Sequence, residues 1–429
     1  MFAFAKIRPI LKPFVRNYVV STPKEITPIV YIEGEEMTRY TMDLILDRWI
    51  DPFIDTNSWK EFDFSCLNRD QTNDKVLEDA VDAGLSLPVI FKEPTITPTN
   101  EQVESMGLSK KLCSPNGYMR SKWNGFTISR DTIRIEGIET GYNKPVFFDR
   151  HAVGGEYNGK WGKVGKGLVK TYYFPDDEST NSVEISSHHL KDDNNVVVTY
   201  FNPLDNVEDM SHHFFSRCLK ANITPYVVTK KTVFGWQEEF WQIMKDVFDK
   251  NYKEDFIKKD LLENCGDDLR HLISDAATMS LVSWSNFRGK DSGGFGMATH
   301  NYDGDMLSDE LSQIYRSPGF ITSCMVGKNN NSKNHIKLFE ASHGTVTDMW
   351  NDHLNGKETS INPIGMVEGL MRALEYSNFL HSGDMNYHVI DNLRNVIYGS
   401  IKEGYGTRDL FGKYGLTTEE FIDHVAKRL

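Results

Sequence analysis

Residues 29–49 read Ile-Val-Tyr-Ile-Glu-Gly-Glu-Glu-Met-Thr-Arg-Tyr-Thr-Met-Asp-Leu-Ile-Leu-Asp-Arg-Trp. The first four residues form a short β-rich run, and the polar residues 33–36 follow it. Residues 37–49 carry apolar side chains at helical spacing, which predicts a helix. A strand that passes directly into a helix is the repeating unit of α/β folds. This stretch therefore predicts an α/β architecture.

Strand and helix patterns alternate in the same way towards both ends of the chain. Residues 73–83 are expected to form a helix and residues 87–91 a buried strand. Residues 364–380 and 417–429 are expected to form the closing helices, and the aromatic-rich residues 234–276 to be mostly helical. The alternation supports an α/β fold.

The middle of the chain has a different composition. Residues 155–200 are rich in Gly, Lys, Val, Thr and Tyr and show short alternating runs, so a β-rich insertion is expected. Residues 162–167 read Gly-Lys-Val-Gly-Lys-Gly, which could be taken for a phosphate loop. The run matches neither the dinucleotide fingerprint nor the Walker A pattern, and no helix pattern follows it. A β-hairpin turn is the better interpretation.

The bulk composition limits the class of protein. A chain of 429 residues is long for one core, so two or three lobes are expected. The formal net charge of −13 argues against a general nucleic-acid binder. No uninterrupted apolar run reaches the roughly 18 residues of a membrane-spanning helix. The five cysteines are scattered without a C-x-x-C pair, which fits free thiols in a reducing compartment and argues against a zinc cluster.

The first 24 residues differ from the rest. They contain five basic residues interleaved with apolar ones, and the first acid is Glu25. A basic, amphipathic segment without acids is typical of an organellar transit peptide. We therefore expect residues 1–24 to be a mitochondrial transit peptide and the protein to act in the matrix.

Residues 301–310 concentrate carboxylates. They read Asn-Tyr-Asp-Gly-Asp-Met-Leu-Ser-Asp-Glu and include Asp303, Asp305 and Asp309. If a helix begins at Asp305, the carboxylates of Asp305 and Asp309 lie on one face, one turn apart. A cation would relieve their repulsion, and oxygen ligands suit Mg²⁺ or Mn²⁺. An acidic helix start that offsets the helix dipole is the alternative for this cluster alone.

Three arginines follow small polar residues in loop-like contexts. Arg120 follows Ser-Pro-Asn-Gly, Arg130 comes ten residues later, and Arg150 lies in Asp-Arg-His-Ala. A guanidinium group can bind a carboxylate through two parallel hydrogen bonds, so three of them suit a substrate with several carboxylates. Residues 92–98 add a lysine and two hydroxyls at a strand end. Taken singly, each arginine would more often be a surface residue.

Eight short motifs make the chain recognisable, and they occur in the order found in homodimeric isocitrate dehydrogenases of the eukaryotic type. They are residues 31–39, 68–74, 95–98, 114–117, 149–152, 301–305, 343–347 and 360–364. The resemblance covers roughly residue 27 to the C-terminus. It implies oxidative decarboxylation of isocitrate to 2-oxoglutarate and CO₂, a reaction of the tricarboxylic acid cycle, with Mg²⁺ or Mn²⁺.

The resemblance also implies an architecture. The isocitrate dehydrogenase-like fold has a large α/β domain (residues 25–124 and 316–429) and a small α/β domain (residues 125–154 and 204–315). A β-rich clasp (residues 155–203) locks two subunits together. The active unit is then expected to be a homodimer with shared active sites.

Roles for single residues follow from the same resemblance. The residues implied to bind the substrate are Thr97, Ser114, Asn116, Arg120, Arg130 and Arg150. Asp305 and Asp309 would bind the metal, joined by an aspartate from the second subunit. Lys230, contributed by the partner subunit, and Tyr157 would be the catalytic base and acid.

The chain departs from the family at the third metal ligand. The family usually has two aspartates after Leu-Ile, whereas this chain has Ser274 and Asp275 there. Ser274 replaces the liganding acid in direct register, so Asp275 is taken as the substitute ligand. Asp303 is expected to support the metal site without binding the metal.

A second departure concerns the coenzyme. NADP-dependent members carry an Arg-His pair after Gly-Thr-Val-Thr, and here Asp348 and Met349 occupy those places. An aspartate repels a 2′-phosphate but accepts hydrogen bonds from a free ribose hydroxyl, so NAD is expected. Gln102 and Val282 likewise stand where the family has further phosphate contacts. The residues implied to bind the coenzyme are Lys92, Thr95, Thr97, Asn116, Glu340, His343, Gly344, Thr345, Val346, Thr347, Asp348, Met349 and Asn362.

Three alternatives remain from the sequence. The first is the same reaction with NADP. The second is a related dehydrogenase for another 2-hydroxy acid such as isopropylmalate or tartrate, which the Ser-Pro-Asn-Gly motif and the three arginines disfavour. The third is a non-catalytic regulatory paralogue, against which the intact Arg150, Tyr157, Lys230, Asp305 and Asp309 argue.

Overall fold

The core of the protein is one ten-stranded sheet with the order β11-β10-β12-β5-β4-β13-β14-β3-β1-β2. The computed structural model describes residues 27–139, 141–177, 180–262, 266–287, 291–329, 334–382 and 388–429. The strands of this sheet are β1 (Val30–Glu33), β2 (Lys60–Asp63), β3 (Val89–Lys92), β4 (Gly125–Thr132), β5 (Val146–His151), β10 (Thr224–Thr229), β11 (Arg270–Ile273), β12 (Phe295–Thr299), β13 (Ile321–Gly327) and β14 (Ile336–Ala341).

Strand direction reverses in the middle of this sheet. β11, β10, β12 and β5 are parallel to one another, and so are β14, β3, β1 and β2. β4 and β13 are antiparallel to each other and to their outer neighbours β5 and β14. The two parallel halves therefore run in opposite directions, and they meet at β4 and β13.

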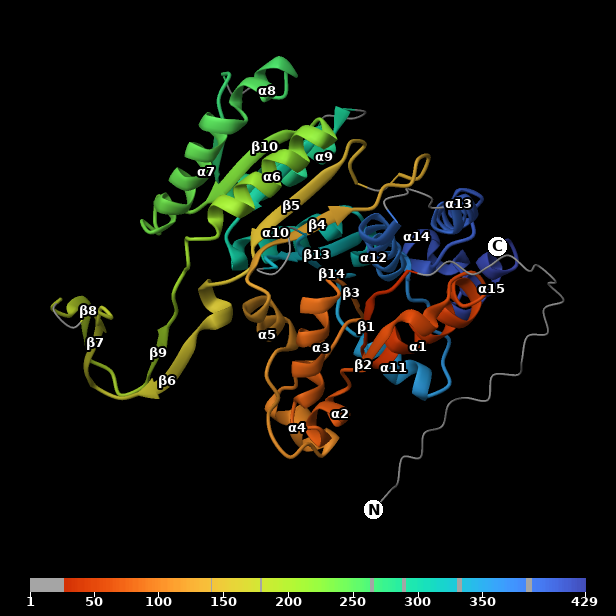
Figure 1. The fold of residues 1–429 in the computed structure, drawn as a ribbon, viewed down its shortest axis with the longest axis horizontal. Coiled ribbons are helices and arrows are strands. Elements are labelled where there is room, and N and C mark those ends of the chain that lie inside the picture. Colours follow the sequence, from red (N-terminus) through yellow and green to blue (C-terminus); the bar gives the residue numbers. More distant parts are fainter. Residues whose placement is uncertain are drawn as a thin grey trace.

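Helices cover both faces of the sheet (Figure 1). α12 packs on β3, β13 and β14, α3 packs on β1 and β2, and α6 and α10 both pack on β5. The helices are α1 (Glu36–Ile45), α2 (Cys66–Gln71), α3 (Lys75–Ser86), α4 (Asn100–Met106), α5 (Pro115–Lys122), α6 (Val207–Ala221), α7 (Gln237–Asn251), α8 (Lys253–Lys258), α9 (Ser274–Phe287), α10 (Asn301–Ile314), α11 (Thr347–Leu354), α12 (Ile364–Ser382), α13 (His388–Lys402), α14 (Arg408–Phe411) and α15 (Thr418–Ala426).

The two ends of the chain share one hydrophobic core. Trp49, near the N-terminal end of the described chain, is 1% exposed and meets Phe421 of α15 edge to face at 6.2 Å between ring centroids. Its indole nitrogen donates a hydrogen bond to the carbonyl oxygen of Ile422 at 2.9 Å. All four residues of β3 are buried, as expected for a strand covered on both faces.

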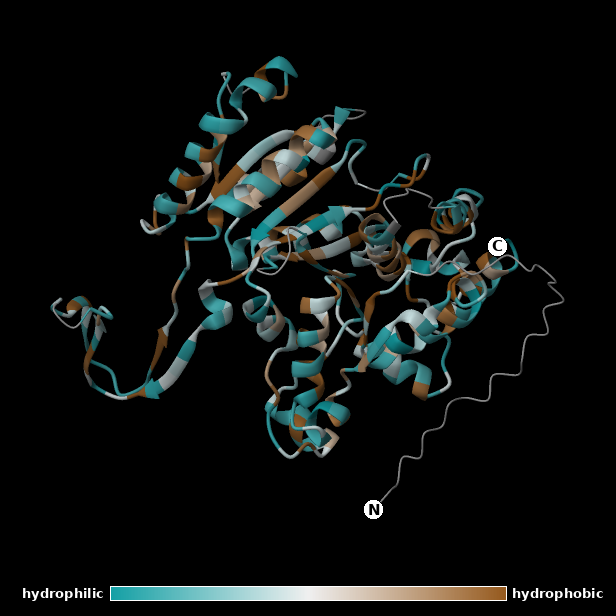
Figure 2. Ribbon diagram, viewed as in Figure 1, coloured by the Kyte–Doolittle hydropathy of each residue, from teal (hydrophilic) through white to brown (hydrophobic). Residues whose placement is uncertain are grey.

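Residues 155–203 leave the body as a long arm (Figure 1). In the arm, β6 (Lys160–Val164) pairs with β9 (Asn195–Thr199), and β7 (Gly167–Tyr173) pairs with β8 (Val183–Leu190). Large apolar side chains are exposed along it, including Trp161 at 70% and Phe174 at 72%. Figure 2 shows hydrophobic residues on the arm as well as in the central sheet. In a single chain, the apolar side chains of this arm are not covered by other parts of the protein.

The predicted α/β fold and the β-rich insertion are confirmed, with three local corrections. Residues 234–276 are mostly helical, as predicted, but β11 interrupts the helices there, pairs with β10 and buries Leu272. Residues 162–167 are not a hairpin turn, because β6 and β7 follow one another along the arm and pair with different strands. The helix of the acidic cluster begins at Asn301 and not at Asp305.

The described residues contain no helix that is long and apolar enough to cross a membrane. The expected transit peptide at residues 1–24 lies outside the described residues.

Candidate active site

Side chains from four parts of the chain meet at the carboxylate of Asp305. This residue lies in the second turn of α10. Arg150 on β5 forms an ion pair with it, and a guanidinium nitrogen of Arg130 on β4 lies 3.3 Å from its Oδ1. Tyr157, at the base of the arm, donates a hydrogen bond to the other carboxylate oxygen. The structure thus brings together four of the residues that the sequence singled out.

Gly304 allows α10 to approach β5 this closely. A Cβ atom at this position would lie 2.1 Å from Oγ1 of Thr299 and 2.4 Å from Cβ of Arg150. Any side chain would therefore push the helix away from the strand. Asp305 reaches Arg150 across the same contact. The glycine of the Asn-Tyr-Asp-Gly-Asp motif is a packing residue that positions the aspartate after it.

Arginines and aspartates alternate at the ends of β4 and β5. Because successive side chains of a strand point to opposite faces, Arg130 and Arg150 face α10, whereas Asp131 and Asp149 face α6. On that second face Arg217 forms ion pairs with both aspartates. The strands that carry the two arginines are therefore held from behind by a partly buried ion-pair network.

The guanidinium groups of the site lie close enough to repel one another. Burial, together with Arg120 and Arg130, lowers the pKa of Arg150 to about 10. Burial also lowers the pKa of Arg120, against the opposing effect of Glu340. Burial alone would raise the pKa of Asp305, but Arg150 and Arg130 outweigh it and lower that pKa. A further anion between the guanidinium groups would relieve their repulsion, so the site favours a multiply charged anion.

Asp309 lies one turn after Asp305 in the same helix and is exposed. Burial of its carboxylate and the nearby Asp305 raise its pKa. Two carboxylates that repel each other on one helix face suit Mg²⁺ or Mn²⁺. No group of three or more His, Cys, Asp or Glu side chains that could hold a metal ion occurs in the described part of the chain. The pair fits a metal but needs a further ligand.

A row of polar side chains crosses the sheet beside this cluster. Arg130 on β4 pairs with Ser323 on β13, and Ser323 pairs with Glu340 on β14. The next strand, β3, places Lys92 beside Glu340, where its Nζ lies 2.9 Å from Oε2 of the glutamate. Burial raises the pKa of Glu340, but Lys92 outweighs this effect and lowers it.

Sequence reasoning missed Ser323. Its side chain is 1% exposed, and its hydroxyl has no hydrogen-bond partner among the described residues. Because paired residues on neighbouring strands share a face, this hydroxyl lies on the same face as Arg130 and Glu340. The signal that could have indicated it is a small polar pair, Thr-Ser, inside the otherwise apolar strand Ile-Thr-Ser-Cys-Met-Val-Gly.

The Ser-Pro-Asn-Gly motif forms the N-terminus of α5. Ser114 caps the helix by accepting a hydrogen bond from a backbone N–H. Oδ1 of Asn116 is buried without a partner among the described residues. Arg120 follows in the same helix and belongs to the arginine cluster. Thr95 and Thr97 lie in the loop after β3, Thr95 half-buried and Thr97 exposed.

The loop before α11 carries the His-Gly-Thr-Val-Thr motif. Thr345 and Thr347 each donate a hydrogen bond to the carboxylate of Glu36, at 2.6 Å and 2.7 Å. Between them, Val346 has φ 60° and ψ 54°, a left-handed conformation that β-branched residues rarely adopt. Such strain persists where the surroundings fix the backbone and is often found at ligand sites. Asp348 is exposed in the first turn of α11.

Three further residues of the predicted coenzyme site surround this loop. Nδ1 of His343 lies 2.9 Å from the carbonyl oxygen of Gly344, and its Nε2 is buried without a partner among the described residues. Met349 packs against the main hydrophobic core. Asn362 donates a hydrogen bond to Asp409 at 2.8 Å. His343 therefore keeps a free ring nitrogen for a ligand.

Gln102 and Val282, which stand where the family has further phosphate contacts, carry no cation either. The side chain of Gln102 completes a capping box with Thr99 at the start of α4. Val282 on α9 is 54% exposed. Together with Asp348 and Met349, these residues supply no positive charge that would attract a 2′-phosphate.

No hydrogen bond or ion pair joins Lys230 or Asp275 to the arginine cluster among the described residues. Lys230 follows β10 and forms an ion pair with Asp275 at the start of α9. The backbone N–H of Lys230 donates to Oε1 of Gln237 at 2.5 Å. Asp303, which is half-buried, lies near enough to Lys230 for the lysine to lower its pKa, although burial and Glu156 raise it overall. None of these contacts joins Lys230 to Asp305.

Several buried polar atoms around the site have no partner among the described residues. They are Oδ1 of Asn116, Nε of Arg130, Nε of Arg150, Oγ of Ser323 and Nε2 of His343. Buried polar atoms in native proteins almost always have a hydrogen-bond partner. Their concentration along one face of the sheet and its loops indicates a polar ligand.

The sequence profile of the isocitrate/isopropylmalate dehydrogenase family matches residues 27–425. The chain belongs to this family. Among its relatives, the mitochondrial isocitrate dehydrogenase [NAD(+)] 1 of Phaeodactylum tricornutum is 55% identical over 97% of this chain and 76% of its own length. The mitochondrial isocitrate dehydrogenase (NAD(+)) of Ostreococcus tauri is 53% identical over 94% of this chain and 85% of its own length.

More distant members of the family are named as NADP-dependent enzymes. The isocitrate dehydrogenase [NADP] of Saccharomyces cerevisiae is 31% identical over 96% of both chains. A solved structure of the Ostreococcus tauri isocitrate dehydrogenase in complex with isocitrate and magnesium(II) matches this fold with a TM-score of 0.87. It is 53% identical and covers 95% of this chain and 100% of its own. The family fold predicted from the sequence is thereby confirmed.

Proposed function

We propose that this protein catalyses the oxidative decarboxylation of isocitrate to 2-oxoglutarate and CO₂, with NAD as the hydride acceptor and Mg²⁺ or Mn²⁺ as the metal. The observation that carries the proposal is the convergence of Arg120, Arg130, Arg150 and Tyr157 around Asp305. The sequence identity to the two NAD-dependent relatives supports the reaction and the coenzyme.

Isocitrate has three carboxylates, and the site supplies cations and hydroxyls for them. Arg120, Arg130 and Arg150 are proposed to bind the carboxylates, assisted by Ser114, Asn116 and Thr97. The depressed pKa of Arg150 reflects the burial and repulsion that such a ligand would offset. The unpaired Nε atoms of Arg130 and Arg150 and the unpaired Oδ1 of Asn116 support this role.

Asp305 and Asp309 are proposed to hold the metal, with Asp275 reaching from a second copy of the chain. When bound, Mg²⁺ or Mn²⁺ supplies Lewis-acid polarisation of the substrate oxygens. Asp305 currently shares its carboxylate between two arginines and a tyrosine, so the substrate carboxylates would take over those arginines. The Ostreococcus tauri structure holds isocitrate together with magnesium(II), which supports this arrangement.

Two proton transfers complete the chemistry. Lys230 of a second subunit is proposed to take the proton of the C2 hydroxyl as a hydride leaves C2 for NAD. After CO₂ departs from C3, Tyr157 is proposed to deliver a proton to C3. Burial and the hydrogen bond to Asp305 raise the pKa of Tyr157, which keeps the phenol protonated at neutral pH.

The coenzyme is proposed to lie along the loop from Glu340 to Met349, with its nicotinamide end near Lys92. Asp348 would accept hydrogen bonds from the free ribose hydroxyls of NAD and repel the 2′-phosphate of NADP. The ratio of kcat/KM for NAD over that for NADP tests the assignment, and a preference for NADP would overturn it.

We further propose a homodimer in which the arm at residues 155–203 is the clasp. The exposed apolar side chains of the arm support this role, because such surfaces are normally covered. Lys230 and Asp275 form an ion pair with each other and none with the arginine cluster among the described residues, which also supports active sites shared between subunits. The division into a large domain (residues 25–124 and 316–429) and a small domain (residues 125–154 and 204–315) remains part of this proposal.

Co-expression of two inactive variants tests the reaction and the shared sites together. Tyr157→Phe and Lys230→Met should each abolish most NAD reduction with isocitrate and Mn²⁺. In a mixed dimer one of the two sites carries neither change, so co-expression should restore about a quarter of wild-type activity. Mixing that restores nothing would place Tyr157 and Lys230 in the same subunit's site.

The cellular location is proposed from the relatives. Two of them are named as mitochondrial enzymes. The basic, acid-free residues 1–24 support a matrix protein in the same way. Fusing residues 1–30 to a fluorescent protein should direct it to mitochondria, and a diffuse cytosolic signal would contradict this.

A further inference from the structure

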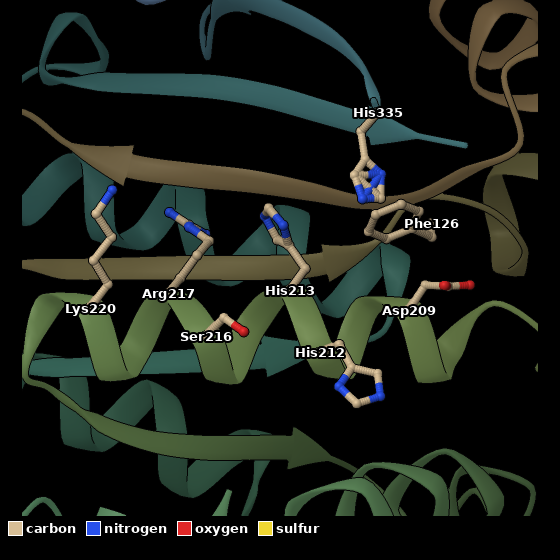
Figure 3. A pocket seen from close by; sticks show the side chains of 8 residues that line it. All are labelled: Phe126, Asp209, His212, His213, Ser216, Arg217, Lys220 and His335. Atoms are coloured by element: carbon tan, nitrogen blue, oxygen red, sulfur yellow. The ribbon is translucent and has the colours of Figure 1, made fainter. Parts of the chain in front are cut away.

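A second cavity lies on the other side of the strands that carry the active-site arginines. It encloses about 380 Å³ between α6, β4 and the segment just before β14. Figure 3 shows Lys220, Arg217 and His213 projecting from α6 on one side of it, with His335 opposite them. Its size is that of an ordinary small-molecule site.

Lys220 gives the cavity a positive charge that no acid balances among the described residues. Lys220 is exposed and has no ion-pair partner among the described residues. The acid at the rim, Asp209, is already neutralised by Lys328 at 2.5 Å. Burial, followed by the nearby charges of Arg217 and Lys337, lowers the pKa of His213. A local cationic pocket is notable in a chain whose net charge is −13.

The donors around the cavity are separate single groups. Arg217 already gives one nitrogen to Asp131 and another to Asp149, so its planar fork is occupied. Ser216 and His212 both contact the hydroxyl of Tyr252, and Nε2 of His213 lies 3.2 Å from Oγ of Ser129. The remaining donors are the ammonium of Lys220 and the imidazole of His335. A carboxylate is best bound by a free guanidinium fork, whereas a tetrahedral phosphate accepts hydrogen bonds from several directions. The lining therefore suits phosphate better than carboxylate.

We propose that this cavity is a second ligand site, which binds a phosphate-bearing small molecule through Lys220, His213 and His335. It lies outside the site proposed for isocitrate and NAD, because Arg217 and Arg130 act on opposite faces of β4.

The two sites are joined by adjacent residues of two strands. Arg217 holds Asp131 and Asp149, and these neighbour Arg130 and Arg150 in sequence. A phosphate beside Arg217 competes with the two aspartates for its charge and adds negative potential behind the strands. Both effects oppose binding of a tricarboxylate on the other face. The coupling is therefore negative, and by linkage isocitrate must weaken phosphate binding by the same factor.

Direct binding to the full-length protein tests the proposal without relying on activity. Isothermal titration with pyrophosphate, inorganic phosphate, ADP and citrate, at constant ionic strength and without divalent metal, should give saturable binding of at least one phosphate ligand and weaker binding of citrate. Lys220→Ala should weaken the bound phosphate ligand about tenfold. The matched control is Lys250→Ala, because both lysines lie in the last turn of 15-residue helices. Lys250→Ala should bind as the wild type does.

Kinetics then test the coupling. At constant free Mn²⁺, the phosphate ligand should raise the KM for isocitrate at least threefold in wild type and in Lys250→Ala, with a smaller rise in Lys220→Ala. Absence of saturable binding, or equal affinity in Lys220→Ala and wild type, would overturn the site. If the phosphate ligand competes with isocitrate equally well in Lys220→Ala and wild type, the ligand binds in the isocitrate site. That result would also overturn the proposed second site. Inactivity towards isocitrate would refute the proposed function while leaving the binding result intact.

Discussion

Tyr157 donates a hydrogen bond to Asp305. The tyrosine lies at the base of the arm and the aspartate in α10, so this bond joins the arm to the body of the protein. It also joins the residue proposed to deliver a proton to a residue proposed to bind the metal. Under this proposal the metal must therefore compete with Tyr157 for the same carboxylate.

Replacement of this tyrosine tests its role as a proton donor. Tyr157→Phe should lower kcat by about 10²–10³-fold, because general acids contribute on that order, while the fold is retained. Steady-state kinetics and circular dichroism measure the two effects. Tyr302→Phe is the matched control, since Tyr302 is exposed and its ring centroid lies 6.4 Å from that of Tyr157. Equal losses in both variants would contradict a chemical role.

Coenzyme preference should move with two residues of α11. Asp348→Arg combined with Met349→His supplies cations for the 2′-phosphate, so kcat/KM for NADP should rise about tenfold or more and that for NAD should fall. Asn351→Arg adds one of the same charges elsewhere in α11 and should leave the ratio nearly unchanged. An unaltered ratio in the double variant would show that this loop does not bind the ribose.

Ser323 should contribute to ligand binding and little to the fold. Its hydroxyl has no partner among the described residues, so Ser323→Ala should change the thermal midpoint little and lower kcat/KM about fivefold. Ser211→Ala is the contrasting control, because the Ser211 hydroxyl donates to the carbonyl oxygen of Val207 at 2.7 Å inside α6. The control should lower stability and spare kcat/KM. A destabilised Ser323→Ala with normal kinetics would refute the ligand contact.

The ion-pair network behind the site should make the free energy of unfolding depend on pH in the acidic range. Burial would raise the pKa of Asp131, but Arg217 and Arg372 outweigh it and lower that pKa to about 2. In the unfolded chain an aspartate has a pKa of about 3.9, so the folded state binds its proton less readily. The stabilisation is therefore complete above about pH 5 and is lost as the pH falls towards about 2.

Asp131→Asn isolates this contribution. At pH 7 it should lower the free energy of unfolding by about 2–4 kcal/mol, since a buried pair is broken. The difference from wild type should shrink between pH 5 and pH 3, as measured by urea unfolding. Asp249→Asn removes a surface partner of Lys245 and should cost less than about 1 kcal/mol. A difference that is constant across this pH range would argue against the network.

The arm should control assembly. Trp161 and Val198 pair across β6 and β9 and are 70% and 53% exposed. Changing both to Glu should convert the proposed dimer to monomer and abolish activity, which sedimentation and the isocitrate assay would follow. Lys191→Glu, in the turn between β8 and β9, adds acid to the same arm without removing apolar surface and should remain dimeric. A fully active monomer would refute the shared site.

Much of the fold could be predicted because local and global signals agree. Residues 29–49 form β1 and α1 as their periodicity predicts, although the helix continues as a wider π turn at Leu46–Ile50. The edge strand β11 was missed because only Leu272 of its four residues is buried, so its pattern is too weak to compete with the flanking helices. Pairing with β10, a tertiary contact, decides it.

Part of the site could also be predicted from the sequence, and part could not. Arg130, Arg150, Tyr157 and Asp305 could be found because each lies in a short motif, and the structure brings them into contact. Arg217 lies in no motif, and its role depends on how α6 packs behind β4 and β5. Nothing in its sequence neighbourhood indicates an ion pair with two aspartates on strands more than sixty residues away.

The position of Tyr157 at the root of the arm has a consequence for newly made chains. Arg130 and Arg150 are fixed by the central sheet, so an unpaired chain can already bind the carboxylates of its substrate. The proposed proton acceptor Lys230, in contrast, comes from a second chain, and the arm that begins beside Tyr157 exposes apolar side chains until that chain arrives. Under the proposed homodimer, encounter of two chains is thus the step that turns a binding protein into a catalyst. Turnover then depends on subunit concentration, and dilution lowers activity by dissociating the dimer.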